Sequence, residues 1–209
     1  MKKLVFFYFC IVLICFMGCT KEETANVSSK LHFELKGPKF YSAPQSTPFA
    51  EPGYISQIDG VDNEVRITSD LDIETTGVYT IKYSSVNKDG VETHLYRTVG
   101  IYSSDVINND LSGTYTRTDN GQEVHWRKVA IGLYIVDNVA GVLNDADYVY
   151  DIYVYNISGN NIDVPLQEDA ITGFTDCVEE TYDGVGTYSW IVVNSALYGT
   201  RTRTFIKSK

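Results

Sequence analysis

The sequence predicts an almost all-β protein: a β-sandwich followed by a second antiparallel β domain, a sandwich or a barrel-like sheet. Val, Ile, Thr and Tyr alternate with polar residues over most of the 209-residue chain, and this is the pattern of half-buried strands. Gly, Asn and Asp separate the alternating runs, as turns do. Beyond residue 30 no useful window has apolar residues at helical spacing. With 44% apolar residues, the chain is too rich in core-forming side chains to be disordered.

The N-terminus has the pattern of an export signal. Two lysines precede an unbroken apolar run over residues 4–17, which is shorter than the roughly 18 residues of a membrane-spanning helix. The sequence therefore predicts a signal peptide over residues 1–18. The run ends in Phe16-Met17-Gly18-Cys19, which resembles a bacterial lipobox with Phe where Leu is usual. The resemblance implies that Cys19 is acylated and becomes the first mature residue.

The residues after this cysteine carry a second resemblance. Cys19-Thr20-Lys21-Glu22-Glu23 is similar to the export signal of Bacteroidetes surface lipoproteins. It implies a protein that is lipid-anchored in the outer membrane and faces the cell exterior, with residues 19–30 as a tether. The alternative is that these charges merely begin a solvated tether. Two or three acyl chains, at about 0.8 kcal/mol per buried CH₂, would make the anchoring permanent.

Charge and cysteine content exclude several classes. The net charge is −10 and the pI is about 4.7, so nucleic acid is not expected as a partner. Once the signal is removed and Cys19 is acylated, only Cys177 remains, and an intramolecular disulfide is excluded. The acidic neighbours of Cys177 would raise its pKa, so we interpret it as a small core or loop residue.

The clearest strands lie between residues 73 and 102. In the first of them, alternation places Tyr79, Ile81 and Tyr83 on one face, and Val78, Thr80 and Lys82 on the other. The turn at residues 87–90 ends in a glycine suited to positive φ, and the chain returns over residues 93–101. This is a hairpin with one core face and one wet face.

Three motifs of this hairpin resemble bacterial immunoglobulin-like domains related to the hyalin repeat. They are Gly77-Val78-Tyr79-Thr80-Ile81-Lys82-Tyr83, Asp89-Gly90 and Arg97-Thr98-Val99. The resemblance covers residues 31–103, with weaker strands near 31–35, 54–58 and 64–67. It implies a sandwich of two sheets and nothing about a ligand.

A polar link over residues 103–110 leads to the second β domain, residues 111–209. Strands are expected at 111–115, at 124–136 around a kink at Gly132, and at 148–155, 162–166, 187–193 and 202–206, in a sheet of about six strands. Residues 132–137, 159–162 and 182–184 make the whole mature chain similar to two-domain Bacteroidetes surface lipoproteins of unknown function. Members often occur beside outer-membrane glycan-uptake systems.

Tyrosine-rich strand 148–155 is the best candidate for a ligand site. Asp151, Tyr153 and Tyr155 share its more polar face, which predicts an exposed surface for stacking sugar rings, with Trp126 and Trp190 behind it. The alternative is that the tyrosines are simply good strand residues and that both tryptophans are core.

Metal and catalytic signatures are absent from the sequence. Oxygen ligands at Asn144, Asp145, Asp147 and Asp151 lack the glycine and terminal glutamate of a calcium loop, which favours a solvated turn. His32, His94 and His125 are far apart in the sequence, so no metal and no cofactor are predicted. The adjacent Glu179 and Glu180 would point to opposite strand faces and could not flank one glycosidic bond. We expect no enzyme.

Two functions remain. The first is a surface-anchored accessory lipoprotein that binds carbohydrate for an outer-membrane glycan-uptake system, with a glycan and an outer-membrane transporter or envelope protein as partners and the lipid as its membrane contact. The second is a non-catalytic structural or protein-interaction module of the envelope, which would dock neighbours through exposed strand edges.

Overall fold

The computed structural model describes residues 30–143, 150–169, 173–193 and 201–208, which are almost all β. Two groups of strands follow each other along the chain, and we call them the N-terminal domain and the C-terminal domain. The N-terminal domain contains β1 (Leu31–Leu35), β2 (Phe40–Pro44), β3 (Tyr54–Ile58), β4 (Val61–Asp62), β5 (Val65–Ser69), β6 (Gly77–Val86) and β7 (Glu92–Tyr102). The C-terminal domain contains β8 (Gly113–Arg117), β9 (Glu123–Ala130), β10 (Leu133–Val136), β11 (Ile152–Ser158), β12 (Asn161–Asp163), β13 (Gln167–Asp169), β14 (Gly173–Thr175), β15 (Cys177–Tyr182), β16 (Thr187–Val192) and β17 (Arg203–Lys207). A 3₁₀ turn, η1 (Ser104–Val106), lies between them.

The N-terminal domain is a sandwich of two sheets with strand orders β1-β3-β4 and β2-β7-β6-β5. The first strand is divided between the sheets, since β1 pairs antiparallel with β3 and β2 pairs parallel with β7. Gly37, at φ +71°, lies at the crossing point. The sequence did not predict β2, because Pro38 precedes it and Pro44 ends it, and prolines are typical of a loop. A strand that pairs on one side only tolerates them.

Alternation in β6 and β7 is confirmed. Tyr79, Ile81 and Tyr83 face the core of the sandwich, and the turn places Gly90 at φ +80°. Arg97, in β7, is fully buried. Its guanidinium donates hydrogen bonds to the carbonyls of Lys36, Pro38 and Gly53 at 2.6–3.1 Å. These bonds and an ion pair with Glu51 at 3.2 Å satisfy a charge that would otherwise be costly to bury, so the arginine is a structural element of the sandwich.

An eight-stranded sheet in the order β12-β11-β10-β9-β8-β17-β16-β15 forms most of the C-terminal domain. Its two outer strands, β12 and β15, lie close together. The Cys177 amide donates to the Val164 carbonyl at 3.4 Å, and the Val164 amide donates to Glu180 Oε1 at 3.3 Å. The sheet is therefore nearly closed and barrel-like. The kink expected at Gly132 is wrong: β9 and β10 pair antiparallel, and Gly132, at φ +68°, lies in the hairpin turn between them.

The core of the C-terminal domain is a cluster of aromatic rings. Tyr115, Trp126, Tyr134, Tyr188, Trp190 and Phe205 are all buried, and neighbouring ring centroids lie 4.6–5.9 Å apart. Two of the polar ends donate to backbone carbonyls: Tyr115 to the Leu111 carbonyl at 2.8 Å and Trp190 to the Val139 carbonyl at 2.8 Å. Burial raises the pKa of Tyr134 to about 12. The tyrosine richness of this segment thus serves packing.

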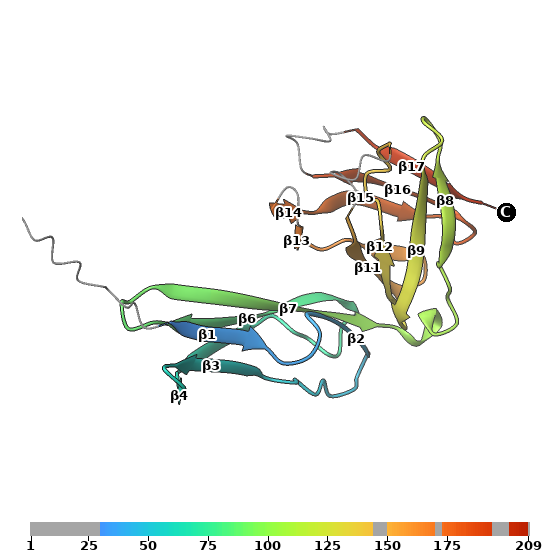
Figure 1. The fold of residues 1–209 in the computed structure, drawn as a ribbon. Helices are drawn as coiled ribbons and strands as arrows, with labels where there is room; N and C mark the ends of the chain where they lie inside the picture. Colours follow the sequence, from blue (N-terminus) through green and yellow to red (C-terminus); the bar gives the residue numbers. More distant parts are fainter. Residues whose placement is uncertain (1–29, 144–149, 170–172, 194–200, 209) are drawn as a thin grey trace, which may run out of the picture.

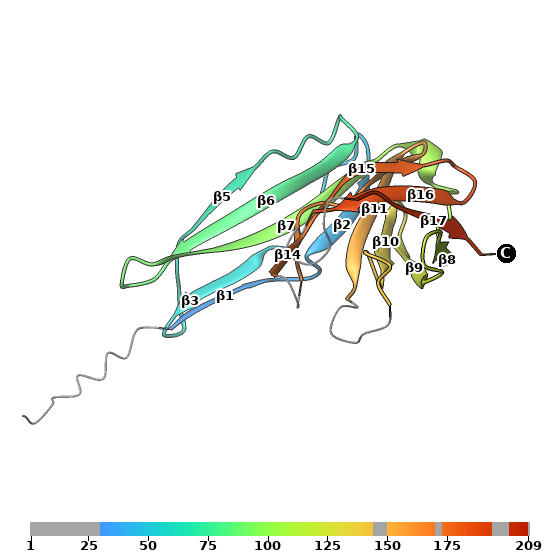
Figure 2. The ribbon, with the colours of Figure 1, turned by 90° about the horizontal axis from the view of Figure 1, so that it is seen from above.

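The C-terminal domain is seated on one end of the outer face of the β2-β7-β6-β5 sheet (Figure 1), where β11 packs on β7. Figure 2 looks down on this sheet, and the stretch of β5, β6 and β7 away from the junction is not covered by the C-terminal strands. The described chain begins, with β1, at the end remote from the C-terminal domain. Within the described ranges, no helix has the length and apolarity needed to cross a membrane.

Candidate functional site

The two tryptophans of the expected stacking surface belong to the core. Trp126 is 3% exposed and Trp190 is fully buried, which confirms the alternative interpretation of both residues. Trp190 lies on the same strand face as Tyr188 and Val192, and all three join the aromatic core. Neither indole face is accessible to a ligand.

Tyr155 is also buried, so its predicted exposure is wrong. Its hydroxyl donates to the Thr98 carbonyl at 3.2 Å across the domain junction, and its ring lies so close to Gly100 that a Cβ there would overlap the ring. Burial raises the pKa of Tyr155 far above its ordinary value. Its neighbour Tyr153 is half-buried and stacks on Phe40 with ring centroids 4.1 Å apart. The N-terminal domain therefore covers the face of β11 that carries Tyr153 and Tyr155.

The remaining predicted site residues do not form a binding site in the described part of the chain. Asp151 is exposed and faces Arg127 at 3.7 Å. Cys19, Asn144, Asp145 and Asp147 lie outside the described residues. In the part of the chain that the structure describes, no group of three or more His, Cys, Asp or Glu side chains is arranged to hold a metal ion.

Cys177 is 4% exposed, which confirms its interpretation as a core residue. Burial raises the pKa of its thiol well above the ordinary value, with the charges of Glu180 and Asp176 adding to the effect. A thiol that stays protonated is a poor nucleophile.

The contact between the domains leaves a cleft of about 420 Å³ beside it. One wall is the outer face of β6 and β7, and the other is the hairpin β13–β14 with the residue before it. The lining residues are Lys39, Thr80, Tyr96, Thr98, Leu166, Gln167, Glu168 and Phe174. We call this the junction cleft.

Gln167 holds the second wall in place. Its side chain is 4% exposed; its amide oxygen accepts a hydrogen bond from the Tyr153 amide at 2.8 Å, and its amide nitrogen donates to the Tyr153 carbonyl at 2.9 Å. The side chain thus pairs with β11 as a neighbouring strand would. Across the cleft, Lys39 Nζ donates to Glu168 Oε2 at 2.7 Å, which links the two domains directly.

Aromatic and polar groups lie next to each other in the junction cleft. Tyr96 is 40% exposed and Phe174 is 56% exposed, while Thr80, Lys39 and Glu168 supply hydroxyl, ammonium and carboxylate groups. Few polar groups among apolar surfaces are typical of small-molecule sites. Sequence reasoning missed both rings. Alternation places Tyr96 on the wet face of β7 and could have identified it, whereas Phe174 lies in a hairpin too short to give a signal.

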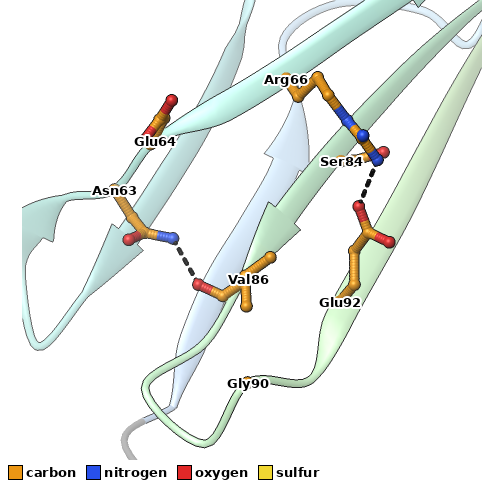
Figure 3. Close-up of a pocket in the computed structure, with 7 residues that line it drawn as sticks. All are labelled: Asn63, Glu64, Arg66, Ser84, Val86, Gly90 and Glu92. Carbon is orange, nitrogen blue, oxygen red and sulfur yellow. Dashed lines mark hydrogen bonds and ion pairs between the residues drawn. The ribbon is translucent and has the colours of Figure 1, made fainter.

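A second pocket, of about 610 Å³, opens near the β6–β7 turn (Figure 3). We call it the tip pocket; its lining residues are Asn63, Glu64, Arg66, Ser84, Val86, Gly90 and Glu92. Arg66 and Glu92 form an ion pair at 2.8 Å, and the Asn63 amide donates to the Val86 carbonyl at 2.9 Å. The tip pocket is polar and contains no aromatic ring.

Comparison with known proteins supports the assignment of the first domain. Residues 33–101 match the family described as a bacterial surface protein, Ig-like domain. Among solved structures, a lipoprotein from Bacteroides thetaiotaomicron matches with 22% identity and a TM-score of 0.39, over 86% of this chain and 100% of that chain. No curated protein matches. The sandwich of the β2-β7-β6-β5 and β1-β3-β4 sheets is therefore immunoglobulin-like, and it coincides with the residues that match this family.

Proposed function

We propose that this protein is a lipid-anchored accessory protein of the cell surface that binds carbohydrate in the junction cleft for an outer-membrane glycan-uptake system. The observation that carries the proposal is the pair of exposed rings, Tyr96 and Phe174, beside polar side chains in one cleft. Sugar rings have apolar C–H faces that stack on aromatic planes, and hydroxyls that need hydrogen-bond partners.

Each lining group has a defined role in this proposal. Tyr96 projects from the middle of β7 and offers its ring as a floor for a sugar. Lys39 and Glu168 offer a donor and an acceptor that already pair with each other at 2.7 Å, so hydroxyls would share rather than replace this contact. Because the two walls come from different domains, the width of the cleft depends on the packing of Tyr155 against β7.

The arrangement of the domains fits display on a membrane. The described chain begins at the end of the N-terminal domain remote from the cleft (Figure 1), so a lipid on Cys19 would leave the cleft facing away from the membrane. The 11 residues of β7 span roughly 36 Å at about 3.3 Å per residue.

Mass spectrometry of the membrane-extracted protein tests the anchor, and an unmodified Cys19 thiol would contradict it.

Affinity electrophoresis against a panel of plant and host polysaccharides, followed by calorimetry, tests carbohydrate binding. Tyr96→Phe keeps the ring and should retain binding, whereas Tyr96→Leu should weaken it by about 5-fold to 10-fold, which corresponds to the roughly 1 kcal/mol of an aromatic contact. Equal affinities of the two variants would contradict carbohydrate binding in the junction cleft. Failure of the unmodified protein to bind any member of the panel would overturn the function itself.

One feature favours a protein-interaction role instead. Strand β5 pairs with β6 on one side, and its last four residues, 66–69, are all exposed. An extended segment of another envelope protein could add to this edge by main-chain hydrogen bonds. Cross-linking in intact cells, with identification of the partner, tests this role; a stoichiometric protein neighbour that is lost on Thr68→Pro would support it.

A further inference from the structure

The junction cleft and the tip pocket open on the same face of the same sheet. Strands β5, β6 and β7 pair without a register shift over their common length, so residues two apart point to one side. Thr80 and Thr98 line the cleft, while Ser84 and Glu92 line the tip pocket. All four belong to the even-numbered set, which faces away from the sandwich core.

The surface between the two pockets continues the same chemistry. Lys82 and His94 occupy it: Lys82 is the cross-strand partner of Tyr96 on β6, and His94 lies two residues from Tyr96 along β7. Lys82 Nζ lies 6.0 Å from the centre of the Tyr96 ring, and the rings of His94 and Tyr96 are 6.3 Å apart. His94 Nδ1 is hydrogen-bonded to Ser84 Oγ at 3.0 Å. Donors and acceptors therefore follow the strands from one pocket to the other, with a ring among them.

Charge on this surface is balanced although the chain as a whole is acidic. Among the residues that line the two pockets and Lys82 between them, the cationic side chains are Lys39, Arg66 and Lys82, and the anionic ones are Glu64, Glu92 and Glu168. At the edge of this surface the Asp70 carboxylate accepts a hydrogen bond from the Thr80 amide at 2.7 Å. Two of the cations are neutralised by ion pairs, Lys39 with Glu168 and Arg66 with Glu92. A strongly anionic or cationic ligand would find no complementary field here.

We propose that this surface, from the junction cleft to the tip pocket, is one continuous track for an internal segment of a linear, uncharged polysaccharide lying along β6 and β7. The proposal rests on the proposed function and specifies its ligand class. From Thr98 to Glu92 the strand advances roughly 20 Å at about 3.3 Å per residue, and a single sugar ring cannot contact both ends of such a track. A polymer can, and it then gains affinity from each subsite.

A ladder of oligosaccharides tests the track. The neutral polysaccharide that the protein binds best in affinity electrophoresis is hydrolysed to its dimer through octamer, and each oligomer is titrated calorimetrically into the unmodified protein. Affinity should rise with length and then level off once the oligomer reaches the tip pocket. Arg66→Ala should weaken the longest oligomers by about 5-fold, the effect of losing one hydrogen bond, and leave the shortest unchanged.

Arg127→Ala is the matched control. Arg127 lies in β9 outside both pockets, and its side chain is 66% exposed against 69% for Arg66. This variant should bind every oligomer like the unmodified protein, and thermal unfolding should show that both variants remain folded.

The outcomes separate the track from the cleft. Affinity that does not depend on length, or equal binding of long oligomers by Arg66→Ala and the unmodified protein, would overturn the track and leave carbohydrate binding in the cleft intact. Preference for a uronic acid polymer, with affinity that falls steeply with salt, would overturn the uncharged ligand class. Absence of binding to every polysaccharide would overturn the proposed function.

Discussion

Tyr155 illustrates at the scale of single residues what alternation predicts and what it omits. The period of two correctly separates Ile152 and Val154, which join the core of the C-terminal domain, from Tyr153 and Tyr155 on the opposite face. It contains no information about what covers that opposite face. The N-terminal domain covers it, with Gly100 beneath the Tyr155 ring, so a face that is not core in one domain becomes a junction between two.

Cys177 gives a direct test of burial at this scale. Because burial raises the pKa of the thiol and only 4% of the residue is exposed, the folded protein should not react with a thiol reagent at neutral pH. Spectrophotometric titration should find one reactive thiol only after urea is added to a form that lacks residues 1–19. Fast reaction of the folded protein would show that the contact between β12 and β15, beside Cys177, opens in solution.

Replacement of Glu179 by glycine should stabilise the folded protein. Glu179 has φ +56° at the register shift between Val178 and Thr181 in β15, and left-handed backbone costs a side-chain-bearing residue roughly 1–2 kcal/mol. After the entropy cost of glycine, Glu179→Gly should raise the free energy of unfolding in urea by about 0.5–1 kcal/mol. Glu34→Gly, at an exposed position of regular strand β1, is the control and should lower it. A loss of stability for both variants would contradict the assignment.

At the scale of elements, strand length and turn chemistry decided what could be predicted. Strands β6 and β7 are long, alternate regularly and flank a turn in which the Asn87 side chain accepts hydrogen bonds from the Asp89 and Val91 amides, so the hairpin was recognisable. Strands β13 and β14 have three residues each, too few for a period to appear. They nevertheless form a wall of the junction cleft, which is why half of that site had no signal in the sequence.

The seam between β12 and β15 should make stability depend on pH. Burial raises the pKa of Asp163 above its ordinary 3.8, and the charge of Asp176 raises it further. Between the ordinary and the raised pKa, the unfolded chain binds fewer protons than the folded chain, so stability falls as the pH rises. The stability that Asp163 contributes is therefore present in acid and is lost toward neutral pH. Asp163→Asn should therefore increase the free energy of unfolding at neutral pH, with the difference from the unmodified protein vanishing below about pH 4.

Asp183 is the control for this pH profile, since its shift is opposite. The amides of Val185, Gly186 and Thr187 donate to its carboxylate at 2.8–2.9 Å and lower its pKa. Stability from this group is present above the ordinary carboxyl pKa and is lost as pH falls through the lowered value. Asp183→Asn should therefore destabilise the protein at neutral pH. Urea unfolding at a series of pH values tests the pair: a destabilised Asp163→Asn would contradict the first assignment, and a stabilised Asp183→Asn would contradict the second.

At the scale of the whole molecule, Gly100 and Tyr155 couple the two domains. Gly100→Ala places a methyl group against the buried ring and should cost about 1–3 kcal/mol by overpacking. Tyr155→Ala should cost about 3 kcal/mol by opening a cavity. In the double variant the alanine at position 100 no longer meets the ring, so the two costs should fall short of additivity by about 1 kcal/mol or more in urea unfolding. Additive costs would mean that the ring does not pack on β7 in solution.

The sequence by itself determined the all-β class, the hairpin β6–β7 and the inner face of the sandwich, because strand period and turn residues are local properties. Tertiary structure alone decided that Tyr155 is buried and that the rings of Tyr96 and Phe174 line one cleft. These features depend on contacts between residues about 55 to 80 positions apart. No local pattern records such contacts, since they arise only when two separately patterned domains pack against each other.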